Sequence, residues 1–170
     1  MILLFPTELE AAPFRAMCPE VEVVVCGVGM AQTAACVARL FAEGHRSFLL
    51  AGIAGAYGDT LVKGEVVAVA EERVAGLPQQ FDRAHKASTL PEGLRIVRSN
   101  TVSACGAEAC GADVENMEGA ALFALCEEFG AECCEVRAIS NRVGEPREEW
   151  CVPTALENLA HAVRQIISKQ

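Results

Sequence analysis

The sequence alternates between short runs of β-branched and apolar residues and longer segments with helical periodicity, and this alternation constrains the fold most. The pattern is typical of α/β proteins, in which helices connect mainly parallel strands that are buried on both faces. Over the first third of the chain it predicts strands at residues 2–5, 21–26 and 47–51, and helices at residues 8–17 and 31–42.

The same pattern continues to the end of the chain. It predicts strands over residues 65–74, 94–97 and 133–140, and helices over residues 117–129 and 154–168. Residues 75–93, rich in proline, glycine and mixed charge, form the only extended loop that we expect. With 170 residues and 52% hydrophobic content, we expect one domain over residues 1–170. The predicted fold is a three-layer α/β/α arrangement with a mixed, largely parallel central sheet.

The formal net charge of the chain is -9 at pH 7. An acidic chain lacks the basic face that nonspecific binding to nucleic acid or anionic lipid requires. We therefore expect a small-molecule partner, with no nucleic acid and no membrane. Glu8 and Glu10 interrupt the apolar start before a signal-peptide core forms, and no apolar run approaches the roughly 20 residues of a membrane span. These features predict a cytoplasmic location.

The nine cysteines lie mostly within apolar runs. Their odd number and their placement favour reduced, buried thiols over a disulfide framework. Cys105 and Cys110 lack the two-residue gap and the distant partners of a zinc site. We expect no metal and no organic cofactor.

Two glycine clusters follow predicted strands. The first, Gly27-Val28-Gly29, opens a helix, and the second spans residues 51–56 and includes Gly52, Ala54 and Gly55. Backbone amides in such turns can approach a polar ligand closely, and two turns at successive strand ends would form one floor of a crevice. Simple strand-terminating turns are the alternative for both clusters.

Polar residues surround the stretch DVENMEGAALFALCEEFGAECCEVRAISNR, residues 113–142. Glu115 and Glu118 lie around a helix start, where the macrodipole alone favours carboxylates, but Glu118 has small and apolar neighbours and needs hydrogen-bond donors if it is partly buried. Asn141 and Arg142 end the predicted strand, where a turn-forming Asn is the alternative. Glu10, in the first strand-to-helix segment, faces either the crevice or water.

The motifs CGVGMAQTAA, LLAGIAGAYGDTLVKGEVVAV, VENMEGAALFAL and EVRAISNRVG, in this order, resemble the nucleoside phosphorylase and nucleosidase superfamily. The likeness is greatest to its futalosine hydrolase branch, which is related to methylthioadenosine/S-adenosylhomocysteine nucleosidase. The resemblance implies cleavage of a ribosyl N-glycosidic bond and a homodimer. It assigns the attacking water to Glu10 and the ribose hydroxyls to Glu118, with Met117 packing against the sugar.

At position 141 the sequence has Asn where the nucleosidases that act on adenine nucleosides have Asp. An amide donates a hydrogen bond to N7 or O6 of a purine but cannot deliver a proton as a carboxylic acid does, so Asn141 favours a 6-oxopurine base. The arginine that family phosphorylases carry before the second glycine cluster is absent, so water is the expected nucleophile, although Arg142 keeps phosphorolysis open.

The chain is shorter than its family, and residues 76–92 replace a longer segment that helps to enclose the ligand. Loss of that cover admits water and loosens the positioning of the substrate. Three functions therefore stay open at this point: a futalosine-like nucleosidase, a methylthioadenosine/S-adenosylhomocysteine nucleosidase or nucleoside phosphorylase, and a noncatalytic nucleoside-binding relative.

Overall fold

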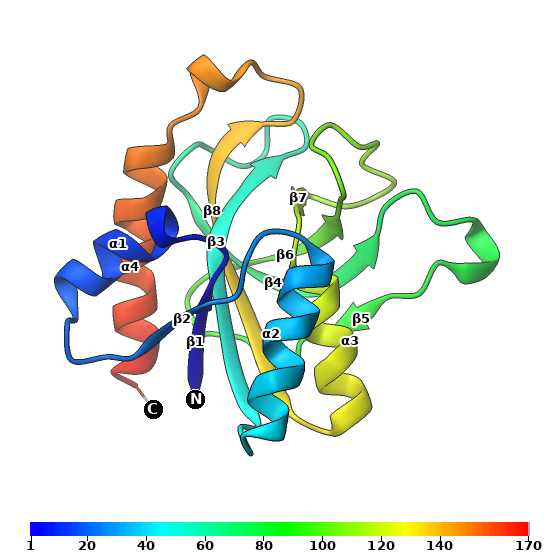
Figure 1. The fold of residues 1–170 in the computed structure, drawn as a ribbon. Coiled ribbons are helices and arrows are strands. Elements are labelled where there is room, and N and C mark those ends of the chain that lie inside the picture. Colours follow the sequence, from blue (N-terminus) through cyan, green and yellow to red (C-terminus); the bar gives the residue numbers. More distant parts are fainter. Residues whose placement is uncertain (170) are drawn as a thin grey trace.

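The computed structural model describes residues 1–169, in which helices cover both faces of a β-sheet (Figure 1). The strands are β1 (Ile2–Phe5), β2 (Val23–Val25), β3 (Ser47–Ala56), β4 (Val66–Val74), β5 (His85–Lys86), β6 (Arg95–Thr101), β7 (Val114–Asn116) and β8 (Glu132–Arg142). The helices are α1 (Glu8–Met17), α2 (Met30–Ala42), α3 (Gly119–Phe129) and α4 (Val152–Ile167), with short 3₁₀ helices at Gln79–Phe81 and Arg147–Glu149.

The long strands β3 and β8 run parallel at the centre of the sheet. β3 also pairs with β7, β8 also pairs with β4, and β6 joins β4 to β7, so these five strands form a closed ring. β1 and β2 extend the sheet beyond β3, and β5 extends it beyond β4. The pairs β3–β7, β4–β5 and β4–β8 are antiparallel and the others parallel. The prediction of a mixed central sheet is confirmed, whereas the closed ring was not predicted.

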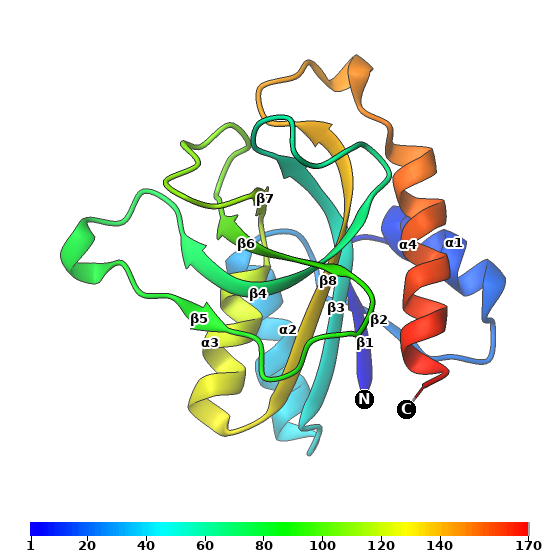
Figure 2. The same cartoon turned by 180° about the vertical axis from the view of Figure 1, so that it is seen from behind.

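Alternate residues of β3 face opposite helical layers. Phe48 and Leu50 pack in a core with α2 and α3, while Leu49 and Ala51 pack in a second core with α1 and α4. Because successive side chains of a strand point to opposite faces, a strand covered on both faces needs an unbroken apolar run. Figure 2 shows the two helical layers from behind. The predicted α/β/α layering is therefore present.

Three differences from the predicted elements bear on the site. β3 continues to Ala56, so Gly52 and Gly55 lie within a strand rather than in a turn, with a register shift between Ala54 and Gly55. β7 was not predicted, and Glu115 lies in it rather than in a helical turn. Residues 102–113 connect β6 to β7 as a second extended segment. Small residues and a three-residue strand leave little periodicity to detect.

Helix α3 contributes to the core of this chain. Ala120, Leu122, Phe123 and Cys126 are buried, and the last three pack in one core with residues of β3, β4 and β8. The helix ends at Gly130, whose positive φ of 62° forms a left-handed cap. Within residues 1–169, every helix is too short or too polar to cross a lipid bilayer.

Candidate active site

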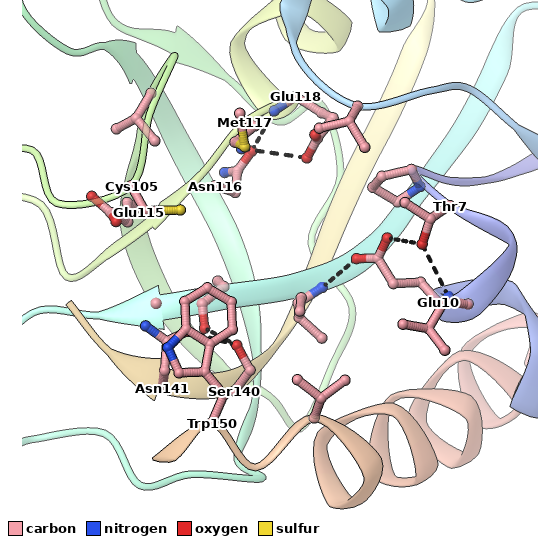
Figure 3. A pocket seen from close by; sticks show the side chains of 18 of the residues that line it. Thr7, Glu10, Cys105, Glu115, Asn116, Met117, Glu118, Ser140, Asn141 and Trp150 are labelled. Atoms are coloured by element: carbon pink, nitrogen blue, oxygen red, sulfur yellow. Dashed lines mark hydrogen bonds between the residues drawn. The ribbon is translucent and has the colours of Figure 1, made fainter. Parts of the chain in front are cut away.

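A cavity of about 230 Å³ lies where the carboxyl ends of β3 and β8 meet the start of α1 and the segment around β7 (Figure 3). Ligands of α/β sheets commonly bind at this end of the strands. The cavity is lined by Pro6, Thr7, Leu9, Glu10, Val28, Ile53, Ala54, Gly55, Val102, Cys105, Glu115, Asn116, Met117, Glu118, Ser140, Asn141, Arg147, Trp150 and Val152.

Glu10 is a buried carboxylate on the first turn of α1. Thr7 caps this helix, accepting a hydrogen bond from the backbone N–H of Glu10 (3.2 Å) and donating its hydroxyl proton to Glu10 Oε2 (2.7 Å). The backbone N–H of Ile53 donates to Glu10 Oε1 (3.0 Å). Burial raises the pKa of Glu10, and the hydrogen bonds from Thr7 and Ile53 oppose this shift. These hydrogen bonds fix the orientation of the carboxyl.

Glu118 stands immediately before α3 and is also buried. The backbone N–H of Gly29 donates to Glu118 Oε1 (2.9 Å), and Arg137 Nη1 donates to Oε2 (3.2 Å). Gly29 itself is outside the lining, and its amide holds Glu118, so its approach to the site is indirect, whereas Val28 of the same cluster lines the cavity. A positive φ of 86° at Gly29 turns the backbone toward this carboxylate.

Asn141 lies near the carboxyl end of β8 with a defined amide orientation. Ser140 Oγ donates to Asn141 Oδ1 (2.7 Å), and Asn141 Nδ2 donates to the carbonyl of Arg142 (2.8 Å). Because Nδ2 carries two protons, one remains for a ligand. In Figure 3, Glu10, Glu118 and Asn141 approach the cavity from three sides.

A buried hydrogen-bond network behind the cavity holds the Glu118 carboxylate in place. Arg137, on β8, is 1% exposed and donates through Nε to Glu135 Oε1 (2.6 Å) as well as to Glu118. Its Nη2 also donates to Asn116 Oδ1 (3.0 Å). Arg137 was not predicted as part of the site, although Glu135 and Arg137, two residues apart in a buried strand, must face the same side of the sheet.

Three predicted ligand-binding residues lie outside the lining. Gly29 acts through Glu118, as described above. Gly52 has no side chain, and this leaves room for its neighbours, since a Cβ there would come within 2.5 Å of Arg137 Nη1 and 3.1 Å of Glu10 Oε1. Arg142 forms an ion pair with Asp59 and donates to the carbonyl of Gly58 (3.1 Å). We therefore correct its predicted role in ligand binding.

Glu115 lines the cavity, but its carboxylate already has donors. Tyr57 Oη donates to Oε2 (2.9 Å), and the backbone N–H groups of Gly106 and Ala107 donate to Oε1 (2.8 Å) and Oε2 (3.2 Å). Glu115 thus fastens the 102–113 segment to β7. Of the other predicted residues, Ala54, Gly55, Met117 and Glu118 do line the cavity.

The rest of the cavity wall is largely apolar, and two of the segments that form it were not predicted to belong to the site. Val102 and Cys105 come from the 102–113 segment, and Trp150 and Arg147 come from the segment between β8 and α4. Within residues 1–169, no group of three His, Cys, Asp or Glu side chains is arranged to hold a metal ion.

The fold is that of solved nucleosidases. A futalosine hydrolase mutant from Helicobacter pylori strain 26695 has a TM-score of 0.84 at 14% identity, covering 99% of this chain and 98% of that chain. The 5'-methylthioadenosine/S-adenosylhomocysteine nucleosidase of Helicobacter pylori gives 0.85 at 14% identity, with 99% and 97% covered. A putative nucleosidase of the same kind from Francisella philomiragia gives 0.86 at 16% identity, with 99% and 98% covered. At these identities the likeness shows the fold alone, and it confirms the predicted fold class.

Sequence similarity is concentrated in the last third of the chain. Residues 106–168 match the model of the family described as the Phosphorylase superfamily. The futalosine hydrolase of Thermus thermophilus is 41% identical over 61 residues, which are 35% of this chain and 27% of that relative. The match thus spans 27% of the length of this curated relative. The resemblance that the sequence motifs predicted is confirmed.

Proposed function

We propose that the protein hydrolyses the N-glycosidic bond of a purine nucleoside, and that a futalosine-like nucleoside with a 6-oxopurine base is its substrate. The observation that carries this proposal is the meeting of Glu10, Glu118 and Asn141 around one cavity, although they lie far apart in the sequence. The reaction has three corresponding requirements: an activated water, a held ribose and a group that stabilises charge on the departing base.

Glu10 is proposed to activate the water. The water oxygen forms a bond to C1′ of the ribose while the bond from C1′ to N9 breaks, and the electrons of that bond pass to the purine. The proton that the water loses passes to the Glu10 carboxylate, and the purine leaves as an anion that takes up a proton from solvent to give the free base. The hydrogen bonds from Thr7 and Ile53 fix this carboxylate before the reaction, so little reorientation is needed.

Glu118 is proposed to accept hydrogen bonds from the ribose hydroxyls. Its position also places a negative charge near the sugar, where positive charge develops as the bond to the base breaks. A preorganised charge of opposite sign stabilises such a transition state more strongly in a site that excludes water. The Gly29 amide and Arg137 hold this carboxylate, and Met117 supplies an apolar wall for the sugar.

Asn141 is proposed to bind the purine. The free proton of its Nδ2 can be donated to N7 or O6 of a 6-oxopurine, both of which are acceptors. Ser140 and Arg142 together set the direction of the amide, which disfavours the flipped orientation. This preference for a 6-oxopurine supports a futalosine-like substrate over methylthioadenosine or S-adenosylhomocysteine.

Two features support water over phosphate as the nucleophile. Arg142, which had kept phosphorolysis open, is bound to Asp59 and Gly58 outside the cavity lining. A phosphate anion beside Glu10 and Glu118 would also meet two carboxylates, and like charges at such short range repel.

Other predictions from the sequence stay predictions. These are the single domain, the homodimer and the cytoplasmic location. The short 76–92 segment contributes no residue to the cavity lining. The test below therefore also distinguishes a nucleoside-binding protein without catalytic activity.

The test is release of free base, measured by chromatography, from futalosine, inosine, methylthioadenosine and S-adenosylhomocysteine, with and without phosphate. The proposal predicts hypoxanthine release from the 6-oxopurine substrates without phosphate, and little adenine release. Release that requires phosphate would identify a phosphorylase. Thermal stabilisation by nucleoside without any base release would identify a binding protein.

A further inference from the structure

Glu135 is a buried carboxylate of β8 that the proposed reaction does not use. Its side chain is 0% exposed and lies behind the cavity rather than in the lining. Arg137 Nε donates to Glu135 Oε1 at 2.6 Å, whereas Arg137 Nη1 donates to Glu118 Oε2 at 3.2 Å. One guanidinium therefore pairs with two carboxylates, and its shorter contact is to the carboxylate that does not line the cavity.

The second oxygen of Glu135 faces another carboxyl group, that of Glu72 on β4. A Cβ on Gly119 would overlap both Glu135 Oε2 and Glu72 Oε1, so these two oxygens converge on one point. Glu135 Oε2 is buried and has no donor within residues 1–169 if both groups are ionised. A proton on Glu72 Oε1 satisfies it, because a protonated oxygen donates to Glu135 and still accepts from Asn116 Nδ2.

The charge of this pair lies on Glu135. Arg137 forms an ion pair with Glu135, and an adjacent guanidinium favours the ionised form of a carboxyl group. Burial, together with the charge of Glu135, raises the pKa of Glu72 well above its usual value. Glu135 thus presents one negative charge to Arg137, while Glu72 is a neutral donor behind it.

We propose that Glu135 is a positioning residue that sets the effective charge of Glu118 by sharing the Arg137 guanidinium. This inference rests on the proposed function, in which Glu118 faces the positive charge that develops on the ribose. A guanidinium that paired with Glu118 alone would neutralise it more completely. Sharing with Glu135 leaves Glu118 with more of its negative charge, and the contact of Arg137 still holds its carboxylate in place.

The effect should appear in the transition state more than in the bound substrate, because the positive charge develops only as the bond to the base breaks. Glu135→Gln should lower kcat for hypoxanthine release from futalosine and inosine by about 10-fold and change KM by less than about 2-fold. A structural role, in which Glu118 is displaced, would raise KM as well. Glu132→Gln, exposed at the start of β8, is the matched control and should keep both constants.

Two ligands that resist hydrolysis test the charge of Glu118 without catalysis. 9-Deazainosine has a neutral ribose, and its iminoribitol analogue carries a protonated nitrogen in place of the ribose oxygen at mildly acidic pH. Calorimetry should show that the wild type prefers the cationic ligand. Glu135→Gln should reduce this preference, as a ratio of Kd values, by about 10-fold, and Glu132→Gln should retain it. Glu135→Asp, which keeps the charge on a shorter side chain, should restore part of it.

Glu72→Gln tests where the charge lies, since it replaces a neutral acid by a neutral amide. It should keep kcat within about 2-fold of the wild type, because one lost hydrogen bond changes no charge. The infrared spectrum of the wild type at neutral pH should contain a carboxylic-acid C=O band that is absent from Glu72→Gln. This band tests the inference even if Glu135→Gln does not fold, and a wild type without it would overturn the assignment of the charge.

The outcomes separate this inference from the proposed function. Base release with equal kcat in Glu135→Gln and Glu132→Gln would overturn the role of Glu135 and leave the nucleosidase intact. A rise in KM that accompanies the fall in kcat, or an equal fall in Glu72→Gln, would also overturn it. If no substrate is cleaved, a cationic preference that weakens in Glu135→Gln supports the inference although the hydrolase proposal has failed. Binding of neither ligand would overturn both.

Discussion

Replacing Glu135 by glutamine removes one charge from the buried network behind the cavity. Glu135 and Arg137 are 0% and 1% exposed, and Arg137 Nε donates to Glu135 Oε1 at 2.6 Å. Glu72 lies beside them, accepting hydrogen bonds from Thr101 Oγ1 (2.7 Å) and Asn116 Nδ2 (2.5 Å). Glu72 and Glu135, together with Glu118, therefore share one buried site with one guanidinium.

The two carboxyls should differ in charge. Glu135 Oε2 is buried and has no hydrogen-bond partner if both groups are ionised. A proton on Glu72 supplies that partner, and burial, together with the charge of Glu135, raises the pKa of Glu72 well above its usual value. Glu135 faces Arg137 directly, so it is the group that remains ionised.

Glu135→Gln and Glu72→Gln should therefore lower the free energy of unfolding by different amounts. Glu135→Gln leaves Glu118 as the remaining ion-pair partner of the buried Arg137 guanidinium, and breaking a buried ion pair in this way costs about 3–5 kcal/mol. Glu72→Gln replaces a neutral acid by a neutral amide and forfeits about one hydrogen bond, or roughly 1 kcal/mol. With a urea m value of about 2 kcal/mol/M, the midpoint should fall by about 1.5–2.5 M for Glu135→Gln and by about 0.5 M for Glu72→Gln.

Urea unfolding followed by circular dichroism at neutral pH measures both costs. The pH dependence gives a second check: because the folded-state pKa of Glu72 is raised, its contribution to stability is present below about 4.5 and is lost as pH rises through the folded value. As pH rises from about 4.5 through the folded-state pKa of Glu72, the free energy of unfolding should fall more steeply for the wild type than for Glu72→Gln. Equal destabilisation by the two substitutions would refute the assignment of the proton.

Three further predictions concern the cavity and its support. Asn141→Asp should shift the ratio of kcat/KM toward adenine nucleosides, because a carboxylic acid can protonate N7, and an unchanged ratio would contradict the proposed base contact. Activity should fall at acid pH as Glu10 becomes protonated. Thr7→Ala should move this acid limb of the pH–activity profile to higher pH, because it removes a hydrogen bond that lowers the pKa of Glu10. The pH dependence of activity checks this, and Thr7→Ser should keep the wild-type profile. Gly119→Ala should destabilise by about 1–3 kcal/mol despite the better helix propensity of alanine, because its Cβ would overlap the two buried carboxylates, and a thermal melt at or above the wild-type midpoint would contradict this.

Much of the fold could be predicted because apolar periodicity records which faces are buried. The bounds of β1 and α1 agree with the predicted ones, since Thr7 gives α1 a clear start and the apolar run of β1 is short and complete. The closed ring could not be predicted. It depends on pairings such as β3 with β7, between residues about 60 positions apart, and no local pattern encodes such a contact.

The candidate site divides in a similar way. Glu10, Glu118 and Asn141, which were predicted from their residue types and their places near predicted strands, line one cavity. Arg147 and the 102–113 segment were missed because only three-dimensional packing brings them to the cavity. Arg142 lies outside the lining because position at a strand end does not specify side-chain direction, and its guanidinium is paired with Asp59.

The most direct test of the central claim is hypoxanthine release from futalosine by the wild type, Glu10→Gln and Glu8→Gln, measured without phosphate on protein kept reduced. Glu8 is exposed and paired with Arg15, two residues from the proposed base, so it is the matched control. The account predicts release by the wild type and Glu8→Gln and a loss of about 100-fold or more in Glu10→Gln, the usual scale for a general base. Equal release by all three proteins, or none by the wild type, would contradict it.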